Sequence, residues 1–163
     1  MNILYLDFDG VICNCFDFKK DSYLKDPLRS LKNERLWWLE HCLEEADQDA
    51  YIVSISSWAD ATDNIFSFEY FLCVECGFKH LHALKDPNNS TKSFYMKKGD
   101  FKQRPQFVKD TNKLFNAKNY LILDDDLADA YSKENLEFVQ TDHQQGICFQ
   151  NMFLIKDKIK NWI

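Results

Sequence analysis

Two short apolar runs in this chain end abruptly in acidic residues, and this pattern constrains the fold more than any other feature. The first run, residues 3–6, leads directly into Asp7-Phe8-Asp9-Gly10. Because side chains alternate along a strand, we expect Asp7 and Asp9 to point the same way while Phe8 enters the core, and Gly10 lets the chain turn away. Crowded carboxylates repel one another unless a cation neutralises them, and Mg²⁺ prefers oxygen ligands. The sequence therefore predicts a metal-dependent site rather than two acids that merely end an exposed edge strand.

The rest of the chain alternates between strand and helix patterns. Further strands are expected at 51–55, 78–84, 120–123 and 136–141, and helices at 26–47, 62–76 and 105–116, with Thr62 or Asp60 as the N-cap of the second helix. Residues 150–163 fit either a strand or a helix. This alternation is typical of an α/β three-layer sandwich with a mainly parallel central sheet. Ligands bind outside the carboxyl ends of such strands, where Asp7, Ser56 and Asp124-Asp125-Asp126 should meet.

Length and composition fit one globular unit. With 163 residues, 45% of them hydrophobic and 28% charged, we expect a single domain over residues 1–163. No apolar run is long enough to cross a bilayer, and the apolar start lacks the basic lead of a signal peptide, so the expected location is cytoplasmic. The formal net charge of −6 argues mildly against a broad grip on a nucleic-acid backbone but still allows local basic patches.

The cysteines raise one alternative. Cys73-x-x-Cys76 and His80-x-His82 place four soft ligands within ten residues, which would suit zinc. However, both cysteines fall on a predicted helix, and ligand pairs of structural zinc sites are usually more widely separated. Reduced core cysteines are therefore the favoured interpretation, and no disulfide framework is predicted.

The motifs at the strand ends resemble those of the haloacid dehalogenase (HAD) superfamily of phosphohydrolases. The matching residues are Asp7 to Val11, Ser56, and the acid pair Asp124 and Asp125, with Asp129 in the place of a further acid. Ser56-Ser57-Trp58 and Asp124-Asp125-Asp126 are similar to a small bacterial and phage subgroup that includes domains attached to RNA-repair proteins. Ala59 departs from this subgroup, because an arginine is common at that position.

The resemblance implies roles for individual residues. Asp7 would be the nucleophile that forms an aspartyl phosphate, and Asp9 the general acid and base. Mg²⁺ would be held by Asp7, by the backbone carbonyl of Asp9, and by Asp124 or Asp125. Ser56, or alternatively Ser54, would hydrogen-bond a phosphoryl oxygen.

The third motif of the superfamily is a lysine near the start of the helix before the fourth strand. Its positive charge stabilises the phosphoryl group during transfer. Lys102 is the first choice by position, ahead of three other basic residues that the sequence leaves open: Lys98, Arg104 and Lys109.

The function predicted from these features is Mg²⁺-dependent hydrolysis of a phosphomonoester. Since the core helix occupies most of the chain between the first two motifs, we expect a minimal cap or none, and hence an open site. Such a site suits a macromolecular substrate, either a phosphoprotein or a polynucleotide end. The alternative is a catalytically silent HAD scaffold that binds a protein partner, although a silent scaffold has no physical need for mutually repelling carboxylates.

Overall fold

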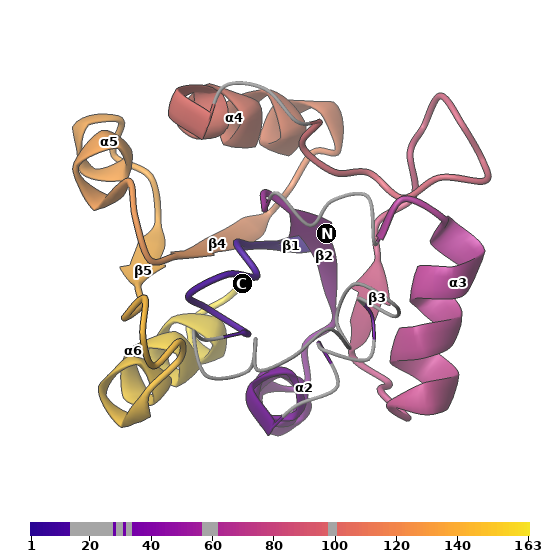
Figure 1. Ribbon diagram of the computed structural model, residues 1–163, viewed down its shortest axis with the longest axis horizontal. Helices are drawn as coiled ribbons and strands as arrows, with labels where there is room; N and C mark the ends of the chain where they lie inside the picture. Colours follow the sequence, from indigo (N-terminus) through magenta and orange to yellow (C-terminus); the bar gives the residue numbers. More distant parts are fainter. Residues whose placement is uncertain (14–27, 29–30, 32–33, 57–61, 98–100) are drawn as a thin grey trace.

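The computed structural model describes residues 1–13, 28, 31, 34–56, 62–97 and 101–163. Its centre is one parallel sheet with the strand order β3-β2-β1-β4-β5 (Figure 1). The strands are β1 (Asn2–Leu6), β2 (Ala50–Ser54), β3 (Leu81–Ala83), β4 (Asn119–Asp124) and β5 (Phe138–Gln140). Because all pairings are parallel, the carboxyl ends of the strands share one edge of the sheet.

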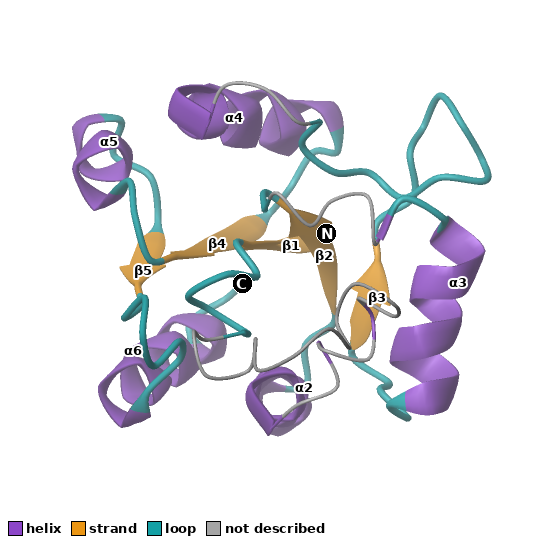
Figure 2. Cartoon of the chain, in the orientation of Figure 1, coloured by secondary structure: helices purple, strands orange, loops and turns teal. Residues whose placement is uncertain are grey.

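Helices cover both faces of this sheet, which confirms the predicted three-layer α/β sandwich (Figure 2). One face carries α2 (Glu34–Ala46) and α6 (Phe149–Lys160), and the other carries α4 (Arg104–Leu114) and α5 (Ala128–Lys133). Beside the edge strand β3 lies α3 (Ile65–Tyr70), which continues as the π-helix η2 (Phe71–Glu75).

The apolar run of β1 follows from burial on both faces. Leu4 and Leu6 belong to the hydrophobic core under α2 and α6, whereas Ile3 and Tyr5 belong to the core under α4 and α5. All four side chains are fully buried. The sequence of a strand that is covered on both faces is a continuous hydrophobic stretch, and for this reason β1 could be predicted from the sequence.

Three local features differ from the sequence-based expectations or complete them. Helix α5 was not predicted, because Tyr131 is its one buried residue and six residues are too few to show a helical period. The N-cap of α3 is Asn64, whose Oδ1 accepts the backbone N–H groups of Phe66 and Ser67. Thr62 is therefore not the cap, and Asp60 lies outside the described residues. The C-terminal segment is a helix, α6.

The connection from β3 to α4 is long but contains no folded lid in its described parts, 84–97 and 101–103. These hold isolated β-bridges and the short 3₁₀ helix η3 (Phe101–Gln103). Residues 14–27, between β1 and α2, lie outside the described part of the chain, so the minimal cap remains a prediction there. No helix among the described residues combines the length and apolarity needed to cross a membrane.

Candidate active site

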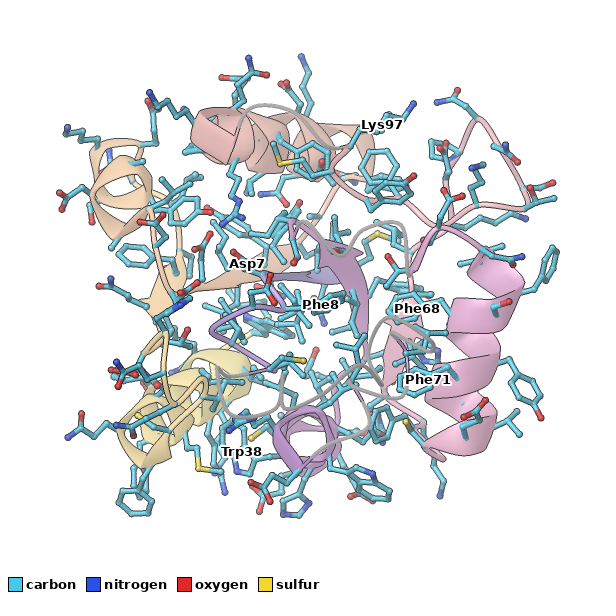
Figure 3. All side chains as sticks on the ribbon, in the orientation of Figure 1. Asp7, Phe8, Trp38, Phe68, Phe71 and Lys97 are labelled. Atoms are coloured by element: carbon cyan, nitrogen blue, oxygen red, sulfur yellow. The ribbon has the colours of Figure 1, made fainter. Side chains whose placement is uncertain are left out.

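Asp7 leaves the sheet at its centre, directly after β1 (Figure 3). Its backbone N–H donates to the carbonyl of Leu123 in β4 at 3.0 Å, which fixes where β1 ends. Phe8 is 1% exposed and enters the core, as the alternation of the strand predicts. Gly10 adopts a φ of 69°, so the chain turns sharply back over the strand ends.

Asp7, Asp124 and Asp125 form an acidic cluster at this edge. Because Leu6 is in register with Leu123, the residues that follow them on β1 and β4 lie side by side. One carboxylate oxygen from each of the three aspartates lies within 4.8 Å of the other two. Three oxygen donors without a soft ligand match the preference of Mg²⁺, so these residues fit the metal that the sequence implies.

A buried arginine compensates part of this negative charge. Nη1 of Arg104, the first residue of α4, lies 2.7 Å from Oδ2 of Asp7 and 2.6 Å from Oδ2 of Asp124. All three side chains are less than 10% exposed, so water screens these contacts weakly. The guanidinium therefore holds two neighbouring carboxylates in fixed positions.

Burial dominates the electrostatics of Asp7. It raises the pKa of this carboxyl to about 7, an effect that Arg104 opposes and Asp124 reinforces. The phenol of Tyr131 donates to Oδ2 of Asp124 at 2.6 Å, and burial raises its pKa far above the usual range, so the group stays a proton donor. Oδ1 of Asp124 accepts the backbone N–H of Asp126. Asp124 is thus held from three sides.

An open cavity of about 500 Å³ lies over this cluster. Its lining consists of Asp7, Asp9, Arg104, Asp125, Asp126, Leu127 and His143. Asp124 does not line it, because that side chain is buried, where it contacts Arg104 and Tyr131. Asp125, in contrast, is partly exposed to the cavity.

His143 was not singled out from the sequence. Its Nδ1 lies 2.6 Å from Oδ2 of Asp125, and this hydrogen bond raises the pKa of the imidazole. The residue comes from the turn after β5, which is tied to the first motif by a hydrogen bond from Oγ1 of Thr141 to the carbonyl of Gly10. Such a contact between distant segments leaves no local signal in the sequence.

The two serines predicted from the second motif are buried at the end of β2. The backbone N–H of Ile55 donates to the carbonyl of Leu6 at 3.0 Å, so Ser56 follows next to the point where Asp7 leaves β1. Oγ of Ser54 accepts the backbone N–H of Ser56 at 3.4 Å. Neither serine belongs to the lining of the acidic cavity.

Asp7 is in contact with a basic residue other than the first choice made on sequence. Lys102 is exposed on η3 and lines a neighbouring cavity with Asp126 and Asp129, and Lys109 pairs with Glu134. Lys98 lies outside the described residues. Arg104 contacts Asp7, because α4 begins at this residue and its first turn faces the strand ends. The geometry therefore favours Arg104 over Lys102.

The four-ligand zinc pattern is not assembled. Cys76 is 3% exposed and packs in the hydrophobic core, and Nδ1 of His80 contacts Asp49 at 3.0 Å. Cys73 and His82 instead lie near Glu69. The favoured interpretation of core cysteines thus holds for Cys76, whereas Cys73 is half-buried at the surface of η2.

Comparison with known proteins agrees with this geometry. The family model described as "HAD domain in Swiss Army Knife RNA repair proteins" matches residues 3–151. The match begins at the second residue of β1 and includes the other four strands and every residue that lines the acidic cavity. A search of the curated proteins and of the solved structures found no match.

Proposed function

The chain belongs to the family of HAD domains in Swiss Army Knife RNA repair proteins, and we propose that it is a Mg²⁺-dependent phosphohydrolase that cleaves a phosphomonoester. Membership of this family indicates phosphohydrolase-type activity in general. The observation that carries the finer proposal is the buried Asp7–Arg104–Asp124 arrangement with Asp125 beside it, at the floor of an open cavity.

In this proposal Asp7 is the nucleophile. A carboxylate oxygen of Asp7 attacks phosphorus, the bond to the leaving oxygen breaks, and an aspartyl phosphate results. Arg104 supports this step in two ways: it holds Oδ2 of Asp7 at 2.7 Å and places positive charge next to the transferring group. Arg104 thus takes the part first given to Lys102.

Asp9 acts as the general acid and base. It lines the same cavity as Asp7, and it would give a proton to the leaving oxygen. In the second half of the reaction Asp9 takes a proton from the water that attacks phosphorus, which releases phosphate and restores the Asp7 carboxylate. Ser56, beside the end of β1, would donate its hydroxyl to a phosphoryl oxygen.

We assign the metal to Asp7, Asp125 and the backbone carbonyl of Asp9. Asp125 is preferred to Asp124 because Asp125 lines the cavity, whereas both oxygens of Asp124 already accept hydrogen bonds from Arg104, Tyr131 or Asp126. Asp124 is then a positioning residue that orients Arg104. Bound Mg²⁺ would supply positive charge that offsets the repulsion between the Asp7 carboxylate and the phosphate.

A second cavity next to the acidic one favours a polynucleotide end over a phosphoprotein as the substrate. A larger cavity of about 820 Å³ adjoins the start of α4: Gln103 lines this cavity, and the next residue, Arg104, lines the acidic one. Its lining includes Phe94, Tyr95 and Lys97, which is labelled near α4 in Figure 3, and also the aspartates Asp63, Asp86 and Asp110. Aromatic and basic side chains together suit bases and phosphates of a single strand.

Turnover of para-nitrophenyl phosphate tests the activity. We expect phosphate release that requires Mg²⁺ and is lost in Asp7→Asn, while Asp157→Asn, an exposed aspartate of α6, retains wild-type turnover. Equal residual rates with Mg²⁺, without it and in Asp7→Asn would contradict the proposed activity and favour the catalytically silent scaffold.

A second assay addresses the substrate. It compares oligonucleotides phosphorylated at the 3′ or 5′ end with phosphopeptides of matched concentration. The proposal predicts a higher kcat/KM for one of the oligonucleotides, and a preference for phosphopeptides would contradict it.

A further inference from the structure

A second group of possible metal ligands lies at the opposite end of the sheet from β5. Glu69 of α3, Cys73 of η2 and His82 of β3 each place one ligand atom within 4.8 Å of the other two. Sγ of Cys73 is 3.2 Å from Oε1 of Glu69, and Nδ1 of His82 is 3.2 Å from the same oxygen. Three side chains from three elements thus converge on one point.

The local fold explains why they converge. Glu69 and Cys73 are four residues apart, so their side chains share one face of the helical segment, which changes from α to π geometry at Phe71. Gly77, with a φ of 73°, ends the helical segment, and the chain then returns as β3 so that His82 faces the helix. π-Helical turns are rare in proteins, and many of them lie at functional sites.

Contacts behind the ligands hold them in place. The backbone N–H of Ala83, in the edge strand β3, donates to Oε2 of Glu69 at 2.6 Å. This bond turns Oε1 of Glu69 towards Cys73 and His82. The ring of Tyr51 packs beside the His82 imidazole, with centroids 5.6 Å apart. Supporting contacts of this kind orient metal ligands before the ion binds.

The cluster offers one carboxylate, one thiol and one imidazole to a cation. The thiol would bind a divalent ion as a thiolate and release its proton.

We propose that Glu69, Cys73 and His82 form a Zn²⁺ site with a fourth position open to water. Tetrahedral zinc with bonds of about 2.0–2.3 Å keeps its ligand atoms roughly 3.3–3.8 Å apart. The two contacts of 3.2 Å to Oε1 of Glu69 need only small shifts to reach this spacing, and the ligand atoms of Cys73 and His82 lie within 4.8 Å of each other. One thiolate and one imidazole select zinc over magnesium. The three side chains are half-buried, so the ion can enter from solvent.

The zinc site is separate from the acidic cavity. His82 is in register with Tyr51, and Tyr51 with Ile3, so Asp7 lies four residues farther along and two strands across. At about 3.3 Å per residue and about 4.8 Å between strands, the two backbones are roughly 16 Å apart. The ion would therefore join α3 and η2 to the edge strand β3 and take no part in phosphoryl transfer.

The test is a titration of the metal-free protein with Zn²⁺. Excess Mg²⁺ is present to occupy the acidic cluster, and a non-thiol reductant keeps the cysteines reduced without binding zinc through a thiol. We expect a single Zn²⁺ per chain, and Cys73→Ser and His82→Gln should each weaken its binding at least about tenfold. His80→Gln and Cys148→Ser are matched controls outside the cluster and should bind as the wild type does. Co²⁺ in place of Zn²⁺ should give a thiolate charge-transfer band that is absent from Cys73→Ser.

Three outcomes would overturn the proposal. These are wild-type protein without a cobalt–thiolate band, undiminished Zn²⁺ affinity in Cys73→Ser, or an equal loss in His80→Gln, which would point to a different ligand set. If Cys73→Ser does not fold, the Zn²⁺ affinities of His82→Gln and His80→Gln provide the same comparison between a ligand and a control. None of these readouts depends on phosphatase activity.

Discussion

Replacing Gly10 by alanine tests whether the position of Asp125 matters for activity. A Cβ at residue 10 would lie 2.3 Å from Cγ and Oδ2 of Asp125. Ordinary contact needs at least about 3.4 Å, so the carboxylate must move by about 1 Å, and misplacement of that size costs on the order of 10²-fold in rate. The substitution removes no functional group, so such a loss would come from displacement alone.

Gly77→Ala is a matched control for the backbone strain. Both glycines adopt positive φ, 69° and 73°, but a Cβ at Gly77 meets no atom within 4 Å. Each alanine should lower the free energy of unfolding by about 1–2 kcal/mol, measured by urea denaturation, because an L-residue is strained in this region. Only Gly10→Ala should also lose about 10²-fold in turnover of para-nitrophenyl phosphate and weaken Mg²⁺ binding. Equal turnover in the two variants would refute the reasoning.

Three further predictions follow from the same contacts. Arg104→Met should lower turnover by on the order of 10²-fold or more, because it removes the cation beside Asp7. Lys102→Met, at an exposed lysine, should leave turnover unchanged, and the opposite result would restore Lys102 to the site. Glu40→Ala should lower the free energy of unfolding by about 2–4 kcal/mol in urea, since the buried carboxylate accepts the backbone N–H groups of residues 79–81, and an unchanged midpoint would contradict this. Mg²⁺ at 100 times its Kd should stabilise the protein by about 2.7 kcal/mol and raise its Tm, and Asp125→Asn should abolish that shift.

The central strands and their acidic ends could be predicted because the signals are local. Each apolar run is long enough to be a strand covered on both faces, and Asp7 and Asp124 follow directly in sequence. Parallel pairing then brings their carboxylates together without any knowledge of side-chain contacts.

The surrounding residues could not be predicted, since their roles depend on where distant elements begin. Lys102 and Arg104 are two residues apart in a basic stretch, and what distinguishes them is that α4 begins at Arg104 with a proline in its first turn. His143 reaches Asp125 only because the turn after β5 packs against the first motif.

The zinc pattern illustrates the same limit. Its cysteines and histidines were visible in the sequence, but Glu69 was not singled out, because the pattern was built from thiols and imidazoles alone. The ligand set depends on β3 returning beside α3 and η2, and such a contact between separate elements leaves no signal in the local spacing.

The most direct test of the central claim is to trap the phosphorylated enzyme. Substrate labelled with ³²P is mixed with protein and Mg²⁺, the reaction is stopped with acid within a turnover, and the labelled peptide is mapped by mass spectrometry. The account predicts label on Asp7 that appears and decays at rates compatible with turnover, and none in Asp7→Asn. Phosphate release by the wild type without label on Asp7, or with label on another residue, would contradict it.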